Sequence, residues 1–420
     1  MSDPDNIVLV TVDSWRADYC GFMGGSNSHT PAMDRMASEG LVFENAIAPG
    51  PATTDSMPVS FSGDFYPRPD PEWSAIDDPD FIRNHMRARE TIPERLVHRG
   101  YETAAFTTNP WTSRRYGFDE GFDHFEDFMG SETTKKGPLE GYLDRLLTDE
   151  DGGSAIKPVQ LLLDWRQQND MFQSWETFYD DIIAWTEQAS EPYFLWIFLV
   201  DAHMPFFPID EFRSQSRLET ILTNLWLYLG NDRFESMFGG RLETAYGDTV
   251  RYVDDRFGQL TTDLEASDPV FIVHGDHGEE FGERGVYGHG QNLSEELIKV
   301  PLLIVNGPSG RVRQPFSLAD LPKLIERLAD RGSIEDLARP FVQSRNFDPK
   351  TAVRGADWKY VVSENDEHLY TSGSECGENE MVHRELQLIG QDVTSKWQQE
   401  SREREQITRS AQEIVTAEQM

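Results

Sequence analysis

The chain has few cysteines, few lysines and no long apolar run. Its two cysteines, Cys20 and Cys376, are too few for a disulfide framework or a cysteine-rich zinc site. The longest strongly apolar run, Tyr193–Val200, has eight residues, whereas a helix needs about 20 to span a bilayer. The first five residues are polar and acidic, unlike those of a signal peptide. We therefore expect a cytoplasmic protein that does not insert into membranes.

Positive charge is scarce along the whole sequence. Lys and Arg total 38 against 74 Asp and Glu, which gives a net charge of -36, and only eight of the basic residues are lysines. A surface with this charge repels phosphate backbones, so we expect no binding to nucleic acids. A dispersed excess of carboxylates is typical of halophilic proteins, in which counterions screen the self-repulsion. An ordinary acidic cytosolic protein is the alternative.

Apolar residues are nevertheless frequent enough for a sizeable core, at 38% of the chain, with 11% aromatic. The length allows one large α/β domain with a subdomain, or two to three domains. Unalternating apolar runs, typical of strands buried on both faces, occur at Ile7–Val12, Pro192–Val200, Pro269–His274 and Val300–Asn306. Helical patterns alternate with them at Thr30–Gly40, Glu90–Arg99, Trp175–Gln188, Leu242–Glu265 and Leu318–Leu328. This alternation predicts a mainly parallel sheet covered on both faces.

The pattern changes after about residue 345. Two segments, Ala352–Val362 and His368–Tyr370, predict a short antiparallel sheet, and the charged segment Ser395–Gln419 predicts a frayed helix or tail. The polar stretch 130–170 predicts an insertion or mobile loop. We therefore divide the chain into a large α/β domain over 1–345, a small C-terminal subdomain over 346–390 and a charged tail over 391–420.

Candidate metal ligands follow three of the buried strands. Asp13 follows the first strand, Asp201 and His203 follow the second, and Asp276 and His277 follow the third, with His289 beyond a glycine-rich loop. Because ligands of open α/β sheets bind at the carboxyl ends of the strands, we expect these side chains to lie close together. Carboxylate oxygen and imidazole nitrogen are ligands that divalent cations prefer. The pattern therefore predicts a divalent metal site.

Several motifs, in this order along the chain, resemble those of the sulfatase family of the alkaline phosphatase superfamily. They are Asn6–Asp18, Thr30–Gly40, Asp276–Glu279 with Tyr287–Gly290, Val300–Leu302, and Val353–Arg354 with Trp358–Tyr360. The resemblance extends from about residue 6 to residue 372. It implies a three-layer α/β/α sandwich of the alkaline phosphatase/sulfatase type with a small C-terminal subdomain. It also implies that 1–345 is the catalytic domain of a metal-dependent hydrolase of sulfate or phosphate esters.

The position of the nucleophile departs from the sulfatase pattern. Sulfatases carry a Cys or Ser, converted to formylglycine, that opens a Cys-x-Pro-x-Arg element; counting back ten residues from Gly63 leads instead to Thr53. Asp55 and Met57 replace the Pro and the Arg, so we expect no formylglycine, as in the haloarchaeal sulfatase-like proteins that this chain resembles. The segment Thr53–Ser56 is similar to the threonine-nucleophile segment of superfamily phosphodiesterases and phosphoglycerol transferases. An ordinary loop threonine is the alternative.

The resemblance also implies roles for the other site residues. It places Asp13, Thr53, Asp276 and His277 around Mn²⁺, Mg²⁺, Zn²⁺ or Ca²⁺, with His203 and His289 acting on the ester group or, with Asp201, holding a second metal. Relatives often carry a second Asp where this chain has Ser14, and its loss favours the first three metals over Ca²⁺. The spacing Asp201-x-His203 differs from the Asp-x-x-x-His of two-metal relatives, which favours a single metal.

Further candidates concern the substrate and the support of the site. Arg114, Arg115 and Lys299 are candidates for substrate binding, with Trp111 beside them, because arginine binds sulfate and phosphate in a bidentate manner. The two arginines equally suit holding their loop on the sheet, and Lys299 suits a structural role. Arg16 and Asp18 are expected to form a supporting pair.

Two classes of function therefore remain. The first is a hydrolase that acts on a small-molecule or glycan ester through a covalent intermediate on Thr53, and the threonine favours phosphodiester or other phosphoester cleavage. A phosphoglycerol or phosphoryl transferase uses the same nucleophile with another acceptor. The second class is a catalytically degenerate binder of sulfated or phosphorylated glycans, which stoichiometric bound metal would disfavour.

Overall fold

The computed structural model describes residues 5–25, 29–65, 78–128, 174–229, 235–290, 292–347, 350–363, 365–371, 379–380 and 383–418. The insertion expected over 130–170 lies outside these residues. Within the described ranges, no helix combines the length and the apolar character needed to cross a membrane.

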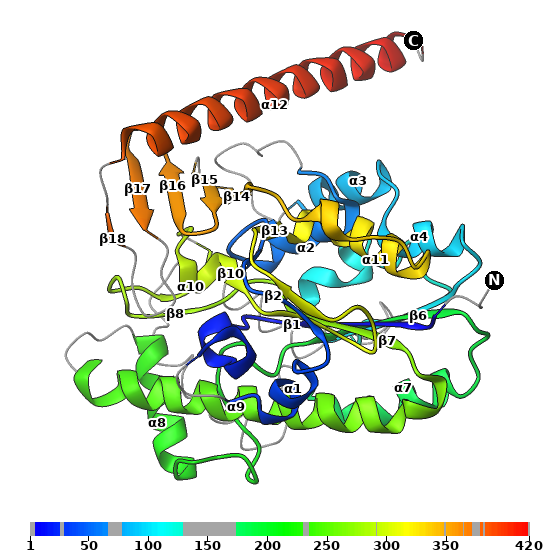
Figure 1. Ribbon diagram of the computed structural model, residues 1–420, viewed down its shortest axis with the longest axis vertical. Coiled ribbons are helices and arrows are strands. Elements are labelled where there is room, and N and C mark those ends of the chain that lie inside the picture. The colour runs from blue at the N-terminus through cyan, green and yellow to red at the C-terminus, as the bar shows by residue number, and fades with distance from the viewer. Residues whose placement is uncertain are drawn as a thin grey trace.

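An eight-stranded mixed sheet forms the centre of the molecule (Figure 1). Its strand order is β12 (Gly310–Val312), β2 (Leu41–Phe43), β11 (Leu302–Val305), β7 (Val270–Gly275), β1 (Ile7–Val12), β6 (Tyr193–Leu199), β4 (Glu102–Thr107) and β5 (His124–Glu126). The strands from β7 to β5 pair in parallel, whereas β11 runs antiparallel to β7 and β2. The predicted parallel core is thereby confirmed.

Helices cover both faces of this sheet and give three layers (Figure 1). One face carries α1 (Pro31–Met36), α7 (Tyr179–Thr186) and α9 (Glu235–Asp263), with α8 (Arg217–Leu229) against α9. The other carries α2 (Thr53–Ser62), α3 (Asp80–Arg87), α4 (Ile92–Val97) and α11 (Leu321–Ala329).

Strand β1 shows why both faces must be covered. Its successive side chains alternate between the faces, so Val8 shares a core with Tyr246 of α9, and Leu9 shares the other core with Phe61 of α2. Each fully buried aliphatic side chain stabilises the fold by about 1.5–3 kcal/mol. An unalternating strand therefore requires helices on both sides.

A second, antiparallel sheet follows the central domain. It comprises β14 (Phe341–Arg345), β15 (Thr351–Gly355), β16 (Trp358–Val362), β17 (Glu367–Thr371) and β18 (Asn379–Glu380). Its first strand thus lies before the boundary that the sequence analysis placed at residue 345. The long helix α12 (Arg384–Glu418) contacts β15 and β16 and then extends away from the body of the molecule (Figure 1).

Three short elements join the two sheets near the carboxyl edge of the central one. They are the sheet of β10 (Lys299–Val300), β3 (Ala46–Ile47) and β13 (Phe316–Ser317), the hairpin of β8 (Glu280–Phe281) and β9 (Tyr287–Gly288), and α10 (Glu295–Ile298). The backbone N–H of Gly278 donates to the carbonyl of Leu297 at 2.8 Å, so α10 holds the segment that follows β7.

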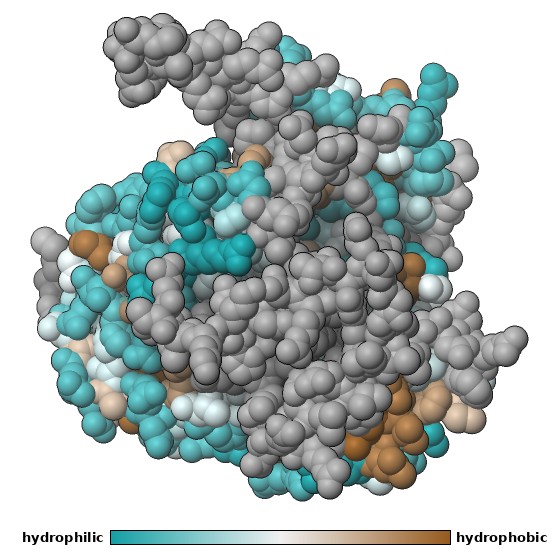
Figure 2. Space-filling view, turned by 180° about the vertical axis from the view of Figure 1, so that it is seen from behind, coloured by the Kyte–Doolittle hydropathy of each residue, from teal (hydrophilic) through white to brown (hydrophobic). Residues whose placement is uncertain are grey.

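The described part of the face in Figure 2 is largely hydrophilic, consistent with the net charge of -36. An apolar patch lies over α8 (Figure 2), where Leu218 and Leu222 are 64% and 42% exposed. On the hydrophilic part of the surface, dissolved salt screens the repulsion between carboxylates.

Candidate active site

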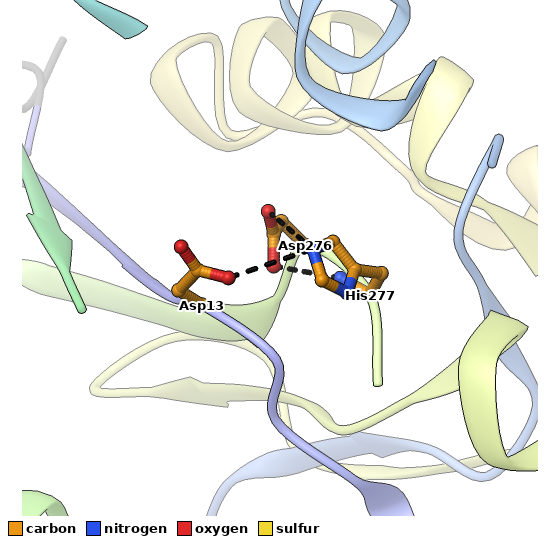
Figure 3. A group of neighbouring side chains, drawn as sticks. All are labelled: Asp13, Asp276 and His277. Atoms are coloured by element: carbon orange, nitrogen blue, oxygen red, sulfur yellow. Dashed lines mark hydrogen bonds and ion pairs between the residues drawn. The ribbon is translucent and has the colours of Figure 1, made fainter. Parts of the chain in front are cut away.

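Two neighbouring strands end in register at the carboxyl edge of the central sheet. Val12 of β1 pairs with Gly275 of β7, so the next residues, Asp13 and Asp276, lie side by side, and His277 follows. One ligand atom from each of these three residues lies within 4.8 Å of the others (Figure 3). All three side chains are buried. Within the part of the chain that the structure describes, no other group of His, Cys, Asp and Glu is as compact.

Thr53 is the first residue of α2 and faces this group. Its hydroxyl donates to Oδ2 of Asp276 at 2.9 Å and lies 3.3 Å from Nε2 of His277. The hydroxyl of Ser56, one turn further along α2, donates to the carbonyl of Asp276 at 2.7 Å. The start of α2 is therefore fixed to the residue that follows β7, and the Thr53 hydroxyl faces Asp276 and His277.

Asn109 belongs to the same site, and the sequence analysis did not identify it. Its side-chain amide donates to Oδ2 of Asp13 at 2.6 Å and lies 3.5 Å from the Thr53 hydroxyl. Its amide oxygen accepts from the backbone N–H of Trp111 at 2.8 Å, which fixes which end of the amide faces Asp13. The polar run that directly follows β4 at the same edge of the sheet was the available signal.

The charges and protonation states of Asp13, Asp276 and His277 suit a cation. Burial, together with the charge of Asp13, raises the pKa of Asp276 well above its ordinary value. Burial and the nearby charge of His289 lower the pKa of His277, so its imidazole is neutral. Its Nδ1 lies 2.8 Å from the Gly278 carbonyl, which only accepts, so Nδ1 carries the proton and Nε2 offers a lone pair. Two buried carboxylates and a neutral imidazole fit a divalent cation.

Two further histidines lie beside His277. The ring of His289 lies 4.5 Å from that of His277, and the ring of His203 lies 5.2 Å from that of His289, between centroids. Nδ1 of His289 lies 3.0 Å from the buried carboxylate of Glu279. Burial alone would lower the pKa of His289, but Glu279, together with Asp13 and Asp276, raises it to about 9. An imidazolium therefore lies next to the candidate metal ligands at neutral pH.

Ser14 and Arg16 support the site from the end of β1. Ser14 has a left-handed backbone (φ 57°); its N–H lies 3.2 Å from Oδ1 of Asp276 and its hydroxyl donates to Asp13 at 3.0 Å. The buried guanidinium of Arg16 binds Asp18 and donates to the carbonyl of Glu279 at 3.0 Å. Ser14 thus orients the two carboxylates.

The remaining candidates from the sequence have other contacts in the structure. Asp201 follows β6, and its charge acts on Tyr252 of α9. Arg114 contacts Asp119 at 3.4 Å and donates to the carbonyl of Phe125, which holds its loop on β5. The guanidinium of Arg115 lies 5.9 Å from the Tyr116 ring. Lys299 lies on β10, where burial lowers its pKa against the opposing charge of Glu295.

Comparisons with known proteins show which sequences and folds this chain resembles. An arylsulfatase from Clostridium perfringens is 22% identical over 423 residues, which cover 87% of this chain and 85% of that protein. The chain spans about half the length, 47% to 49%, of several other curated sulfatases.

Among solved structures, the lipoteichoic acid synthase LtaP from Listeria monocytogenes aligns with a TM-score of 0.62 at 15% identity, covering 96% of this chain and 92% of that one. The phosphonate monoester hydrolase of Agrobacterium radiobacter aligns with a TM-score of 0.56 at 15% identity, covering 87% and 89%. The Sulfatase family model matches residues 5–328, which include both β1 and β7 with the ligands that follow them. This chain belongs to the sulfatase family.

Proposed function

We propose that this protein is a divalent-metal-dependent hydrolase of phosphate esters, with phosphodiesters as the preferred substrates and Thr53 as the nucleophile. The observation that carries the proposal is the Thr53 hydroxyl, 2.9 Å from Asp276 and 3.3 Å from His277, at the position that matches the formylglycine of sulfatases. A threonine does not become formylglycine by the route that sulfatases use. A hydroxyl attacking directly is suited to phosphorus.

The donor set of the site suits the cation that this reaction needs. Asp13, Asp276 and His277, with Thr53 beside them, would hold Mn²⁺, Mg²⁺, Zn²⁺ or Ca²⁺. The raised pKa of Asp276 supports this assignment, because two buried carboxylates repel each other until a cation compensates their charge. When bound, the cation acidifies a coordinated hydroxyl and neutralises charge on the transferred group. The compactness of the Asp13, Asp276 and His277 group favours one metal over two.

The protein groups then complete the proton balance of the first step. Thr53 Oγ1 gives its proton to Oδ2 of Asp276 and forms a bond to phosphorus as the bond from phosphorus to the leaving oxygen breaks. His289, protonated at neutral pH because its pKa is about 9, donates the proton that the leaving oxygen needs. His203, beside His289, binds the oxygens of the ester.

Hydrolysis of the Thr53 intermediate, a phosphodiester that retains the second ester group of the substrate, restores the starting state. Water forms the new bond to phosphorus, Asp276 returns its proton to Thr53 Oγ1, and His289 takes a proton from the water. Asn109 keeps Asp13 and the Thr53 hydroxyl in place in both steps through its contacts of 2.6 Å and 3.5 Å. We place the substrate among small-molecule or glycan esters, as the names of the relatives suggest.

A transferase is the second candidate function. It would use the same intermediate with an alcohol in place of water, and the likeness to the lipoteichoic acid synthase LtaP, at a TM-score of 0.62, favours it. Adding an acceptor sugar to the turnover assay distinguishes the two, since a transferase forms an ester of that sugar. Binding without catalysis does not require a hydroxyl that is aligned with Asp276 and His277, so this alignment disfavours a catalytically degenerate binder.

A turnover assay with two substrates tests the proposal. An aryl phosphodiester and an aryl sulfate with the same leaving group are compared in multimolar KCl with Mn²⁺, since salt screens the net charge of -36. Faster cleavage of the phosphodiester is the expected result. Faster cleavage of the sulfate would contradict the assignment of the substrate, and full activity of Thr53→Ala would contradict the nucleophile.

A further inference from the structure

A cavity of about 880 Å³ lies at the edge of the central sheet opposite Thr53. Its lining includes Asp5, just before β1, and Val270, the first residue of β7. Asp13 is eight residues beyond Asp5, which corresponds to about 25 Å along an extended chain. In Figure 1 the N-terminal end of β1 lies on the right, whereas α10, next to the metal ligands, lies on the left. The cavity is therefore separate from the active site.

Arginines gather around this cavity in an otherwise acidic protein. Its charged lining residues are Arg311, Arg313, Arg327 and Arg331, with Asp5 and Glu335. Glu44 pairs with Arg311 and Arg313, and Asp336 lies 3.4 Å from Arg327. Counted with these two carboxylates, the four arginines are balanced by four acidic groups, so this region is neutral, whereas the whole chain carries -36. Anions are therefore repelled less here than over the rest of the surface.

Two of these arginines are presented side by side. Arg311 of β12 and Arg313 just after it are two residues apart, so an extended chain places them on the same face. Arg311 donates through Nε to Glu44 and through Nη2 to the Phe22 carbonyl at 2.7 Å, and its Nη1 bonds to no other described residue. Arg313 is 85% exposed, and its Nε lies 3.6 Å from Glu44. Both guanidinium groups can therefore donate to a ligand.

Local hydrogen bonds fix the wall of the cavity around Arg331. This residue follows α11 with the left-handed backbone (φ 51°) of a helix C-cap, and the N–H of Gly332 donates to the Arg327 carbonyl at 2.7 Å. Nε of Arg331 binds Asp5 at 2.9 Å. The chain's own contacts therefore set this wall.

The lining also includes apolar side chains, of which the larger are Leu41, Val270, Val312, Leu328 and Ile334. Small-molecule sites are typically of about 300–1,000 Å³ and combine apolar walls with a few polar anchors. Guanidinium groups bind phosphate, sulfate and carboxylate through paired hydrogen bonds. We infer that this cavity binds an organic anion, with a phosphate, sulfate or carboxylate group on an apolar body. The inference is independent of the reaction at Thr53.

Fluorescence titration of the full chain with anilinonaphthalene sulfonate tests the inference, because this probe combines a sulfonate with an apolar ring system. The variant R311Q/R313Q removes the cavity guanidinium groups of β12 and of the residue just after it. We expect saturable binding of one probe per chain and an affinity about tenfold lower in this variant, which corresponds to about 1.4 kcal/mol. Competition by inorganic phosphate, sulfate and acetate then ranks the three head groups.

The matched control is R87Q/R241Q, which removes the same charge from two arginines outside the cavity that are 57% and 42% exposed. Its affinity should stay within about twofold of the parent, because screened distant charges contribute little. A second variant, Ser309→Trp, narrows the cavity without changing charge and should also weaken binding. The inference is overturned if both double variants weaken binding equally, if R311Q/R313Q leaves it unchanged, or if uncharged phenylnaphthylamine binds as tightly as the sulfonate.

Discussion

The hydroxyl of Thr53 donates a 2.9 Å hydrogen bond to Oδ2 of Asp276. The other oxygen of that carboxylate, Oδ1, accepts from the backbone N–H of His277 at 2.8 Å and of Ser14 at 3.2 Å. Two backbone donors thus set the orientation of the carboxylate that faces the Thr53 hydroxyl.

The first prediction concerns the metal. Protein purified without chelator should contain about one divalent cation per chain, because Asp13, Asp276 and His277 form one compact group. Asp13→Asn should lower both this content and the turnover, as measured by elemental analysis and by the phosphodiester assay. The control Asp255→Asn, at a side chain that is 53% exposed, should change neither. Equal metal content in the two variants would contradict the site.

Removing the cation should also lower stability. A ligand that binds only the folded state stabilises it by mass action, by about 2.7 kcal/mol at a free concentration of 100 times its Kd. Chelation should therefore lower the Tm of the parent, and added Mn²⁺ should restore it. The Asp13→Asn variant should show a smaller shift. A Tm that does not respond to chelator or Mn²⁺ would argue against a resident cation.

Asn109 is predicted to act as a positioning residue. Asn109→Ala removes the donor that lies 2.6 Å from Asp13 and 3.5 Å from Thr53, so kcat should fall by about 10–100-fold while KM changes less. Asn109→Asp adds a third carboxylate and should also raise the Mn²⁺ concentration needed for half-maximal rate. Asn84→Ala, at an exposed position on α3, is the control. Parent-like kinetics of Asn109→Ala would refute this role.

The pH profile should report the pair of His289 and Glu279. Because the pKa of His289 is about 9, the imidazolium is present at neutral pH, and the rate should fall as pH rises through about 9. Glu279→Gln removes the largest of the charges that raise this pKa and leaves burial and the charges of Asp13 and Asp276, so the alkaline limb should move to lower pH. Glu265→Gln, at an exposed position, should leave the limb in place. An alkaline limb that Glu279→Gln does not move would contradict the assignment.

A buried ion pair links the C-terminal sheet to α10, the helix that holds the segment with Asp276 and His277. Arg354 of β15 binds both carboxylate oxygens of Glu295 in α10, at 2.9 Å and 3.0 Å. Although burial opposes it, Arg354 together with Lys359 lowers the pKa of Glu295 to about 2. The folded-state pKa lies below the ordinary value, so this contribution to stability is present above pH 4.5 and is lost as pH falls towards 2.

Breaking this pair should therefore be costly. Arg354→Ala leaves a buried carboxylate without its main partner and should lower the free energy of unfolding by about 3–5 kcal/mol in urea at neutral pH. Lys396→Ala, which breaks the exposed pair with Asp392, should have little effect. If the two variants lose similar free energies of unfolding, the buried pair contributes no more to stability than the exposed pair.

The sequence allowed the grouping of Asp13 with Asp276 to be predicted, because this grouping depends on strand ends. Apolar runs locate β1 and β7, and parallel pairing brings their ends together, so Asp13 and Asp276 become neighbours. Helix α2 was not predictable in this way, since nine of its ten residues are buried and no apolar stripe results. Asn109 and the partnership of Glu279 with His289 depend on turns after β4 and around the β8–β9 hairpin, whose paths no residue pattern specifies.

The central claim is that Thr53 becomes covalently bound to the transferred group. The most direct measurement is the intact mass of the enzyme after rapid acid quenching during turnover of the aryl phosphodiester, followed by mapping of the adduct. We predict an adduct on Thr53 that consists of the phosphoryl group with the second ester group of the substrate, forms at least as fast as the steady-state turnover, is absent from Thr53→Ala and is retained in Thr53→Ser. An adduct on another residue, or turnover by Thr53→Ala at the parent rate, would contradict the account.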